Sequence, residues 1–68
     1  MGVDPGDVHA RFALLSPHLN ERLRRYVAAA EAHAAGRRGI SVVSRATGVS
    51  RQAIRRGLAE LQDTPTAA

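Results

Sequence analysis

Residues Thr47–Leu58 read TGVSRQAIRRGL and join two amphipathic segments through a glycine. Glycine adopts the left-handed backbone conformation without a steric penalty, so Gly48 predicts a sharp turn. Ser50 is a suitable N-cap for the segment that follows. The buried stripe expected on that segment comprises Ala53, Ile54, Gly57, Leu58 and Leu61. The stretch therefore predicts a helix, a tight turn and a second helix with separate apolar and basic faces.

The segment before the turn, Gly39–Gly48, is short and amphipathic as well. Ser41 is its candidate N-cap, and Gly48 is the residue that ends it. Its apolar contacts are expected from Val42, Val43 and Ala46. Val49, directly after the turn, is expected to fill the angle between the two helices. This spacing is typical of a helix-turn-helix, which we predict over residues 41–62.

An N-terminal helix is predicted over about residues 1–16. Asp4 is its candidate N-cap, and Pro5 suits its first position, where a missing N–H leaves no hydrogen bond unmade. Its apolar stripe comprises Val8, Phe12 and Leu15. We expect the helix to end by Leu15 or Ser16, because the residue before a proline is pushed out of the helical conformation.

The longest predicted helix covers residues 19–36, with Asn20 as its candidate N-cap and Gly36 as its C-terminal stop. The face expected to be buried comprises Leu19, Leu23, Tyr26, Val27, Ala30 and Ala34. No stretch alternates apolar and polar residues for long, so no strand is expected. The predicted fold class is all-α: a single small four-helix domain over residues 1–68, with a C-terminal helix-turn-helix and a frayed tail at 63–68.

Composition excludes several kinds of site. The 68 residues include no cysteine, which rules out disulfides and thiolate zinc sites. His9, His18 and His33 share no metal-ligand spacing, and there is no phosphate-binding glycine loop, so neither a metal nor another cofactor is expected. No apolar run approaches the roughly 18 residues of a membrane span, and the N-terminus lacks a signal-peptide pattern. We therefore expect a cytoplasmic protein with no membrane partner.

Charge is unevenly distributed along the chain. The formal net charge is +4, and all ten basic residues are arginine. Six arginines and no acid lie between Ala32 and Ala59, whereas the six acids lie outside that stretch. A scattered, solvated surface would mix the two signs more evenly. The asymmetry indicates a polyanionic partner, and together with the helix-turn-helix pattern it predicts sequence-specific binding of double-stranded DNA.

The candidate DNA-binding residues follow from helix-turn-helix geometry, in which the first turn of the second helix enters the major groove. Those positions are Ser50, Arg51 and Gln52, with Arg55 one turn later. Arginine pairs bidentately with guanine and glutamine with adenine, which gives specificity. The remaining candidates are Arg37, Arg38, Arg45 and Arg56. Arg37 and Arg38 have two open interpretations: contacts to backbone phosphates, or charges favoured by the dipole at the end of helix 19–36.

Residues Leu19–Leu61 resemble the N-terminal region of ISAzo-type bacterial insertion-sequence transposases, through the segments HLNER, AAAEA, GIS, RATGVSR and IRRGL. The resemblance implies a helix-turn-helix that binds transposon ends in transposition and DNA recombination. It also implies a following catalytic domain with acidic metal ligands, which we expect to be absent from this chain. Two positions depart from the pattern: Arg38 stands where a glycine is expected, and Ala53 where a threonine is expected. Ala53 lacks the hydroxyl that would touch a phosphate or a thymine methyl.

We expect this chain not to be an enzyme. Metal-dependent strand transfer requires several carboxylates that converge on two metal ions. Glu21 and Glu31 are ten residues apart on one predicted helix, about 15 Å along its axis, and Glu60 has only Asp63 near it. Two other functions stay open. One is a stand-alone transcriptional regulator that dimerises on a palindromic site, and the other is a helical protein-interaction module that associates through the alanine face of helix 19–36.

Overall fold

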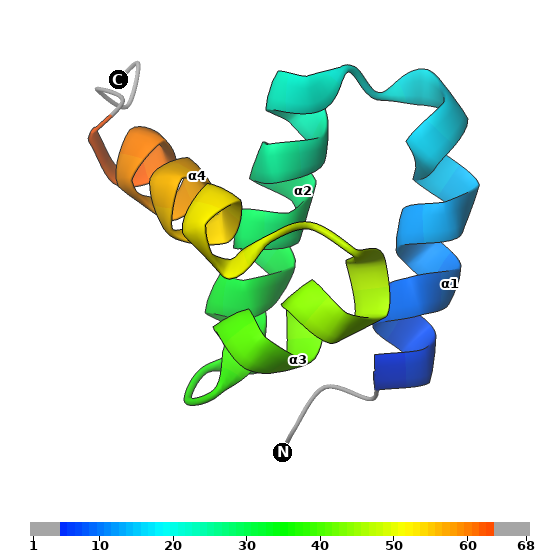
Figure 1. Cartoon of the computed structure of the whole chain (residues 1–68), viewed down its shortest axis with the longest axis horizontal. Helices are drawn as coiled ribbons and strands as arrows, with labels where there is room; N and C mark the ends of the chain where they lie inside the picture. The colour runs from blue at the N-terminus through cyan, green and yellow to red at the C-terminus, as the bar shows by residue number, and fades with distance from the viewer. Residues whose placement is uncertain (1–4, 64–68) are drawn as a thin grey trace.

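A computed structural model describes residues 5–63, which form four α-helices, one short 3-10 helix and no strand. The helices are α1 (Pro5–Leu15), η1 (Ser16–His18), α2 (Glu21–Ala35), α3 (Gly39–Thr47) and α4 (Arg51–Asp63). In Figure 1, α2 lies between α1 and α4, and α3 crosses below them. Helix α3 contacts all three of the other helices, while α4 packs mainly on α2. The prediction of a small, all-α, four-helix arrangement is confirmed for this part of the chain.

Helix boundaries follow the capping residues of the sequence. The Asn20 side-chain oxygen accepts a hydrogen bond from the Leu23 N–H at 2.8 Å, which caps α2. The Ser50 hydroxyl oxygen accepts one from the Ala53 N–H at 3.1 Å, which caps α4. Gly36 and Gly48 end α2 and α3 with positive φ angles of 74° and 78°. These four predictions are confirmed, whereas the Asp4 cap lies outside the described residues.

The start of α3 differs from the prediction. The helix begins at Gly39 rather than near Ser41, and its N-cap residue is Arg38, which makes no side-chain capping bond. Arg38 has a φ of 67° and is the one non-glycine residue of the described part with a positive φ. That conformation costs an ordinary residue about 1–2 kcal/mol. Glycine is therefore the residue that this backbone conformation favours.

Of the two outer boundaries of the domain, the first agrees with expectation and the second differs slightly. Helix α1 begins at Pro5 and ends at Leu15, as its proline signals predict. Helix α4 continues through Asp63, which the sequence had placed in a frayed tail. The rest of that expected tail, residues 64–68, lies outside the described residues.

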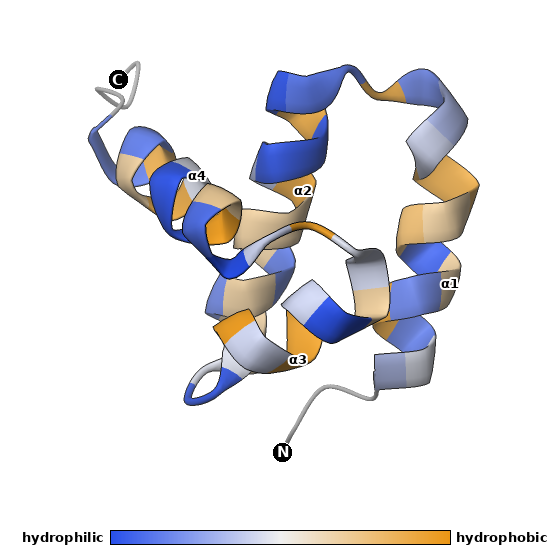
Figure 2. Ribbon diagram, in the orientation of Figure 1, coloured by the Kyte–Doolittle hydropathy of each residue, from blue (hydrophilic) through white to orange (hydrophobic). Residues whose placement is uncertain are grey.

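All four helices contribute to one apolar core. Its fully or almost fully buried members are Val8, Phe12, Ala28, Ala32, Val43 and Ile54. In Figure 2 apolar segments alternate with hydrophilic ones along each of the four helices. Val49 packs against this core from the α3–α4 connection, as predicted. Leu15 and Leu61, which were expected in the buried stripes, are 41% and 39% exposed.

The buried face of α2 matches the predicted one only in part: Leu19 and Val27 pack against the core, as predicted. Ala28, Ala29 and Ala32 are buried, whereas Ala30, Ala34 and Leu23 are exposed. Glycines on the neighbouring helices explain the difference, because they let those helices approach the α2 backbone. A Cβ on Gly39 would lie 2.1 Å from the Ala32 carbonyl oxygen, and one on Gly57 would lie 2.8 Å from the Arg25 carbonyl oxygen. Close approach of α3 and α4 therefore buries a narrow alanine face.

Polar contacts on the surface tie the helices together. Arg11 of α1 donates two hydrogen bonds to the Glu31 carboxylate of α2, at 2.7 and 2.8 Å. The His9 Nδ1 atom lies 2.9 Å from the Ala46 carbonyl oxygen of α3, within hydrogen-bonding distance. Arg25 of α2 forms an ion pair with Glu60 of α4 at 2.7 Å. These contacts fix α1 and α4 at their positions on α2 and α3.

Acidification should weaken the fold through Glu31. Hydrogen bonds from Arg11 hold the pKa of Glu31 below its ordinary value of 4.5, although partial burial of the carboxylate opposes this. A carboxylate whose pKa is lowered by folding stabilises the fold at any pH above its ordinary pKa. This stability is lost as the pH falls through the folded-state pKa. When the pH is lowered below 4.5, the thermal midpoint of Glu31→Gln should therefore decrease less than that of the wild type. Glu21→Gln, an exposed position on the same helix, is the control, and parallel curves for Glu31→Gln and wild type would contradict the assignment.

Candidate nucleic-acid interface

The connection between α3 and α4 places the start of α4 firmly. It consists of Gly48, Val49 and Ser50. The Thr47 hydroxyl donates to the Val43 carbonyl at 2.7 Å and accepts from the Val49 N–H at 3.2 Å. Since Val49 also packs on the core, the turn is held by both hydrogen bonds and apolar contacts. The first turn of α4 is therefore a rigidly supported element.

Helix α4 separates an apolar face from a basic one. Ile54 and Gly57 are buried, whereas Arg51, Gln52, Arg55 and Arg56 are exposed. At 100° per residue, Gln52 lies near the centre of the exposed face, with Arg51 and Arg55 on one side of it and Arg56 on the other. The apolar face is used for packing, so the basic face remains available to a partner.

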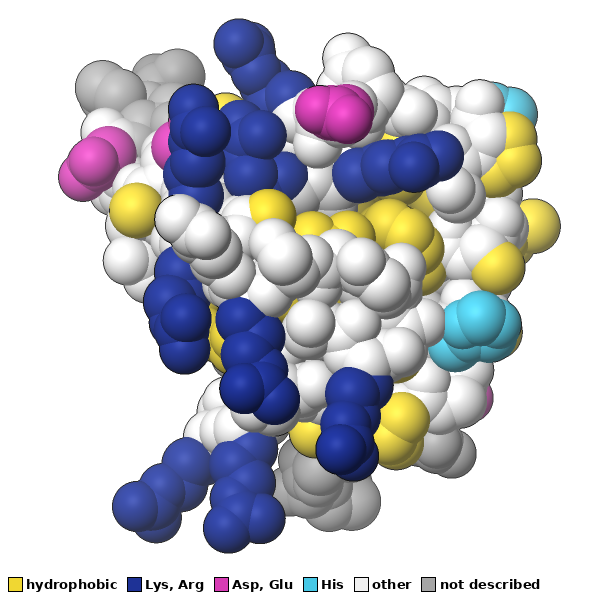
Figure 3. All heavy atoms as spheres, viewed as in Figure 1, with side chains coloured by type: hydrophobic (Ala, Val, Ile, Leu, Met, Phe, Trp, Pro, Cys, Tyr) yellow, Lys and Arg dark blue, Asp and Glu magenta, His cyan; other side chains and the backbone are white. Residues whose placement is uncertain are grey.

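Arginines from neighbouring elements extend this basic face. Arg45 on α3 and Arg37 and Arg38 in the α2–α3 turn are exposed. In Figure 3 dark blue side chains gather over α4, the α2–α3 turn, α3 and the start of α2. Within residues 5–63, the ion pairs of arginine involve Arg11, Arg25 and Arg56. The arginines at positions 37, 38, 45, 51 and 55 thus carry charge that no carboxylate of the described part neutralises.

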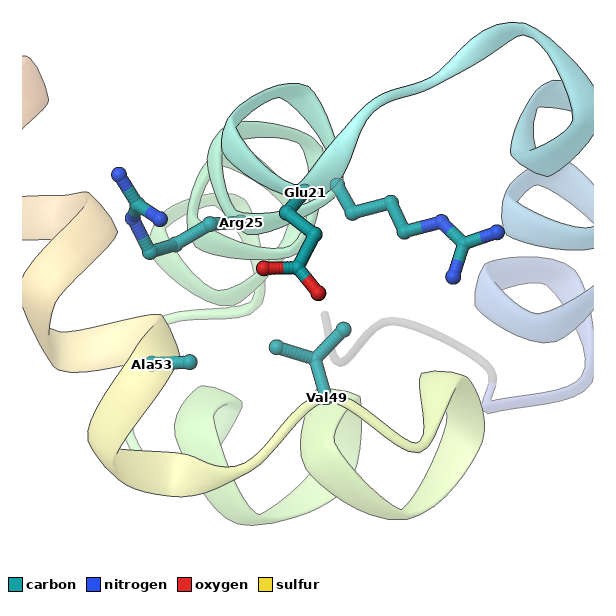
Figure 4. Close-up of a pocket in the computed structure, with 5 residues that line it drawn as sticks. Glu21, Arg25, Val49 and Ala53 are labelled. Carbon is teal, nitrogen blue, oxygen red and sulfur yellow. The ribbon is translucent and has the colours of Figure 1, made fainter.

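A groove runs between the start of α2 and the start of α4. One part is lined by Glu21, Arg24, Arg25, Val49 and Ala53, and the adjoining part by Arg25, Ser50, Gln52, Ala53 and Arg56. In Figure 4 the Glu21 carboxylate points toward Val49 and Ala53, and Arg25 extends toward α4. Arg25 also lies 5.7 Å from the centre of the Tyr26 ring. The groove brings α2 residues to the edge of the face that carries Gln52.

All eight predicted DNA-binding residues lie on exposed positions. The structure gathers Ser50, Arg51, Gln52, Arg55 and Arg56 at the start of α4, and it brings Arg38 and Arg45 beside Arg51. Arg25 and Glu21, which line the same surface from α2, were not predicted to belong to it. The run of three arginines within residues 22–25 was a signal for Arg25.

The described residues carry no sign of a metal centre or a membrane span. Among residues 5–63 no group of three or more His, Cys, Asp or Glu side chains is placed to hold a metal ion. No helix in the same part of the chain has both the length and the apolar character to cross a membrane. Comparison with protein-family models, curated proteins and solved structures finds no match to this chain.

Proposed function

We propose that this chain binds double-stranded DNA, with α3 and α4 acting as a helix-turn-helix. The observation that carries the proposal is the division of α4, whose apolar face is used in the core while its opposite face exposes Gln52, Arg55 and Arg56. The exposed arginines of α3 and of the α2–α3 turn adjoin that face, and residues 32–59 contain no acid. A polyanion matches this surface better than a neutral protein partner does.

The dimensions of an α-helix suit this role. A helix with side chains is about 10–12 Å across, and the major groove of B-DNA is about 12 Å wide. With the start of α4 in the groove, Gln52 at the centre of the exposed face would reach an adenine edge and Arg55 a guanine edge. Ser50 uses its oxygen as an acceptor in the helix cap. Its hydroxyl proton remains available to a phosphate or a base.

The resemblance to transposase N-terminal regions supports a more specific role. On that basis we propose that the chain is the transposon-end-binding module and acts by binding rather than catalysis, without a cofactor. A dimeric transcriptional regulator would use the same α4 surface on each half of a palindromic site. The two roles differ in the number of chains on each DNA molecule. Measurement of the mass of the complex by light scattering distinguishes them.

Binding to a labelled duplex should be detectable by fluorescence anisotropy at about 50 mM salt and should weaken steeply by about 200 mM. Each neutralised phosphate contributes a slope of about −0.9 to the dependence of log affinity on log salt. Exchange of Arg55 and Arg56 for glutamine removes two charges from the exposed face of α4 and should abolish measurable binding at the higher salt concentration.

Arg11→Gln with Glu31→Gln is the control, because the pair leaves net charge unchanged and lies on α1 and α2 away from α4. Absence of binding at about 50 mM salt, where counterion release favours it most, would refute the proposal. Self-association of the chain that does not weaken with salt would indicate instead a protein-interaction module with an apolar interface.

A further inference from the structure

Three arginines surround a pocket where the start of α3 meets the start of α4. Its lining consists of Arg38, Ser41, Val42, Arg45 and Arg51. Arg38 precedes α3, Arg45 lies within α3, and Arg51 is the first residue of α4. No carboxylate belongs to the lining, and none of the three arginines forms an ion pair within the described part of the chain. Three arginines without a carboxylate partner in the lining of one hollow favour an anion there.

The first turn of α3 adjoins the same pocket through Ser41 and Val42. No side chain caps this turn; the Gly39 N–H donates to the Gly36 carbonyl at 2.9 Å, which leaves the amides of Ile40 and Ser41 as its donors. The positive end of the helix dipole also lies there. Ser41 adds a half-exposed hydroxyl from this first turn. The arginines and these donors together match a tetrahedral group with several negatively charged oxygens, which is the chemistry of a phosphate.

The backbone at Arg38 provides an independent indication of function. Its φ of 67° and ψ of 5° lie in the left-handed region, which disfavours any residue with a side chain. Glycine would adopt that conformation without strain. Residues in such conformations are held there by the surrounding structure and cluster at functional sites. At this position, arginine contributes a third positive charge to the pocket, beside Arg45 and Arg51.

We propose that Arg38, Arg45 and Arg51, with Ser41, together hold one phosphate group, and that this group is a single backbone phosphate of the DNA. The assignment of the phosphate to DNA rests on the proposed function, whereas the phosphate site itself does not. The proposal assigns Arg51 to a phosphate, although its place in the first turn of α4 had suggested a base contact. Gln52 and Arg55 are then the residues that read bases.

The salt dependence of duplex binding tests whether one phosphate is shared. Removal of all three arginines, in Arg38→Gly/Arg45→Gln/Arg51→Gln, should reduce the salt slope by about 0.9, the value for one phosphate contact. The loss of affinity should be equal for all duplex sequences and should be about 3.5-fold greater at about 50 mM than at about 200 mM salt. A slope reduced by about 2.7 would mean three separate phosphates and would overturn the proposal. Losses from Arg51→Gln that differ between duplexes would overturn it as well.

Arg22→Gln is the control, since it removes one charge from an exposed position outside the pocket lining. The single variant Arg38→Gly separates function from folding. It should weaken binding of every duplex while its thermal midpoint rises by about 4 °C, because glycine relieves the strain. A midpoint that falls, with binding unchanged, would contradict the role given to Arg38.

Titration with inorganic phosphate, followed by backbone amide chemical shifts, tests the site without DNA. The amides of Ile40 and Ser41 should shift in the wild type and much less in the triple variant. If they do not shift, the phosphate site is wrong, even if the chain binds DNA. If they shift and the chain binds no duplex, the site stands, while the proposed function and the DNA source of the phosphate fail.

Discussion

Gly39→Ala should destabilise the protein by about 3 kcal/mol, the upper part of the range for overpacked interiors. The new Cβ would lie 2.1 Å from the Ala32 carbonyl oxygen and 3.1 Å from the Ala35 Cβ. The carbonyl belongs to the backbone of α2 and cannot rotate away, so α3 would have to move off α2. A domain of this size has a free energy of unfolding of roughly 3–10 kcal/mol. The thermal midpoint should therefore fall by about 15 °C in a circular-dichroism melt.

The direction of this effect is informative because helix propensity predicts the opposite sign. Alanine is favoured over glycine in a helix by about 1 kcal/mol. Ala59→Gly, at an exposed position of α4, is the matched control and should cost about that amount. Gly57→Ala should give a smaller loss than Gly39→Ala, because its Cβ would lie 2.8 Å from the Arg25 carbonyl oxygen. A stabilised Gly39→Ala variant would show that α3 does not approach α2 as closely as described.

Gln52→Ala should remove discrimination between DNA sites by about 1–3 kcal/mol, the value of a good bidentate base contact. Gln52 lies at the centre of the exposed face of α4, and alanine there keeps the helix while removing both the amide donor and the acceptor. Affinity for the preferred duplex should fall by about 5–150-fold, while affinity for unrelated duplexes changes little. Competition binding against a randomised duplex pool measures the two quantities together.

Arg37→Ala is the control for that experiment. Arg37 lies in the turn before α3 and is expected to touch a phosphate rather than a base. Its removal should weaken all duplexes about equally and reduce the salt slope by about one. Equal, sequence-independent losses from both variants would show that α4 is not the helix that reads DNA.

Local signals in the sequence predicted most helix boundaries, because each depends on a few neighbouring residues. Asn20 and Ser50 cap their helices through their own side chains, and Gly36 and Gly48 end theirs through their own φ angles. Ser41 resembled a cap for the same local reason and was wrong. The start of α3 is set instead by a tertiary contact, the approach of Gly39 to the Ala32 backbone. No local pattern contains that information.

The buried face of α2 was predicted only in part, for a related reason. Hydrophobic periodicity ranks large residues as core, so Leu23 was expected inside and Ala28 was not included. Packing of α2 against two helices with glycines at their contact points reverses this order, since only small side chains fit there. The apolar pattern on α4 was read more accurately because one stripe of it packs against its neighbours. Leu61, at the far end of that stripe, is nevertheless 39% exposed.

The candidate interface was predictable where it lies within one helix. The exposed positions of Gln52, Arg55 and Arg56 follow from helical periodicity and the apolar stripe. The grouping of Arg38, Arg45 and Arg51 around one pocket did not follow, because it depends on the angle between α3 and α4. The contribution of Arg25 also depends on the placement of α2 beside α4, where Glu60 binds its guanidinium group.

The short connections between the helices have a consequence for the order of folding. Helices α2, α3 and α4 are joined by three residues each time, and each of them contacts the other two. Small helical domains of this kind fold within microseconds to milliseconds. Helix α1 has few contacts with its neighbour α2 and packs mainly on α3, as in the contact of His9 with Ala46. We therefore expect α2–α4 to form the nucleus and α1 to dock late, so that substitutions in α1 accelerate unfolding and leave the folding rate nearly unchanged.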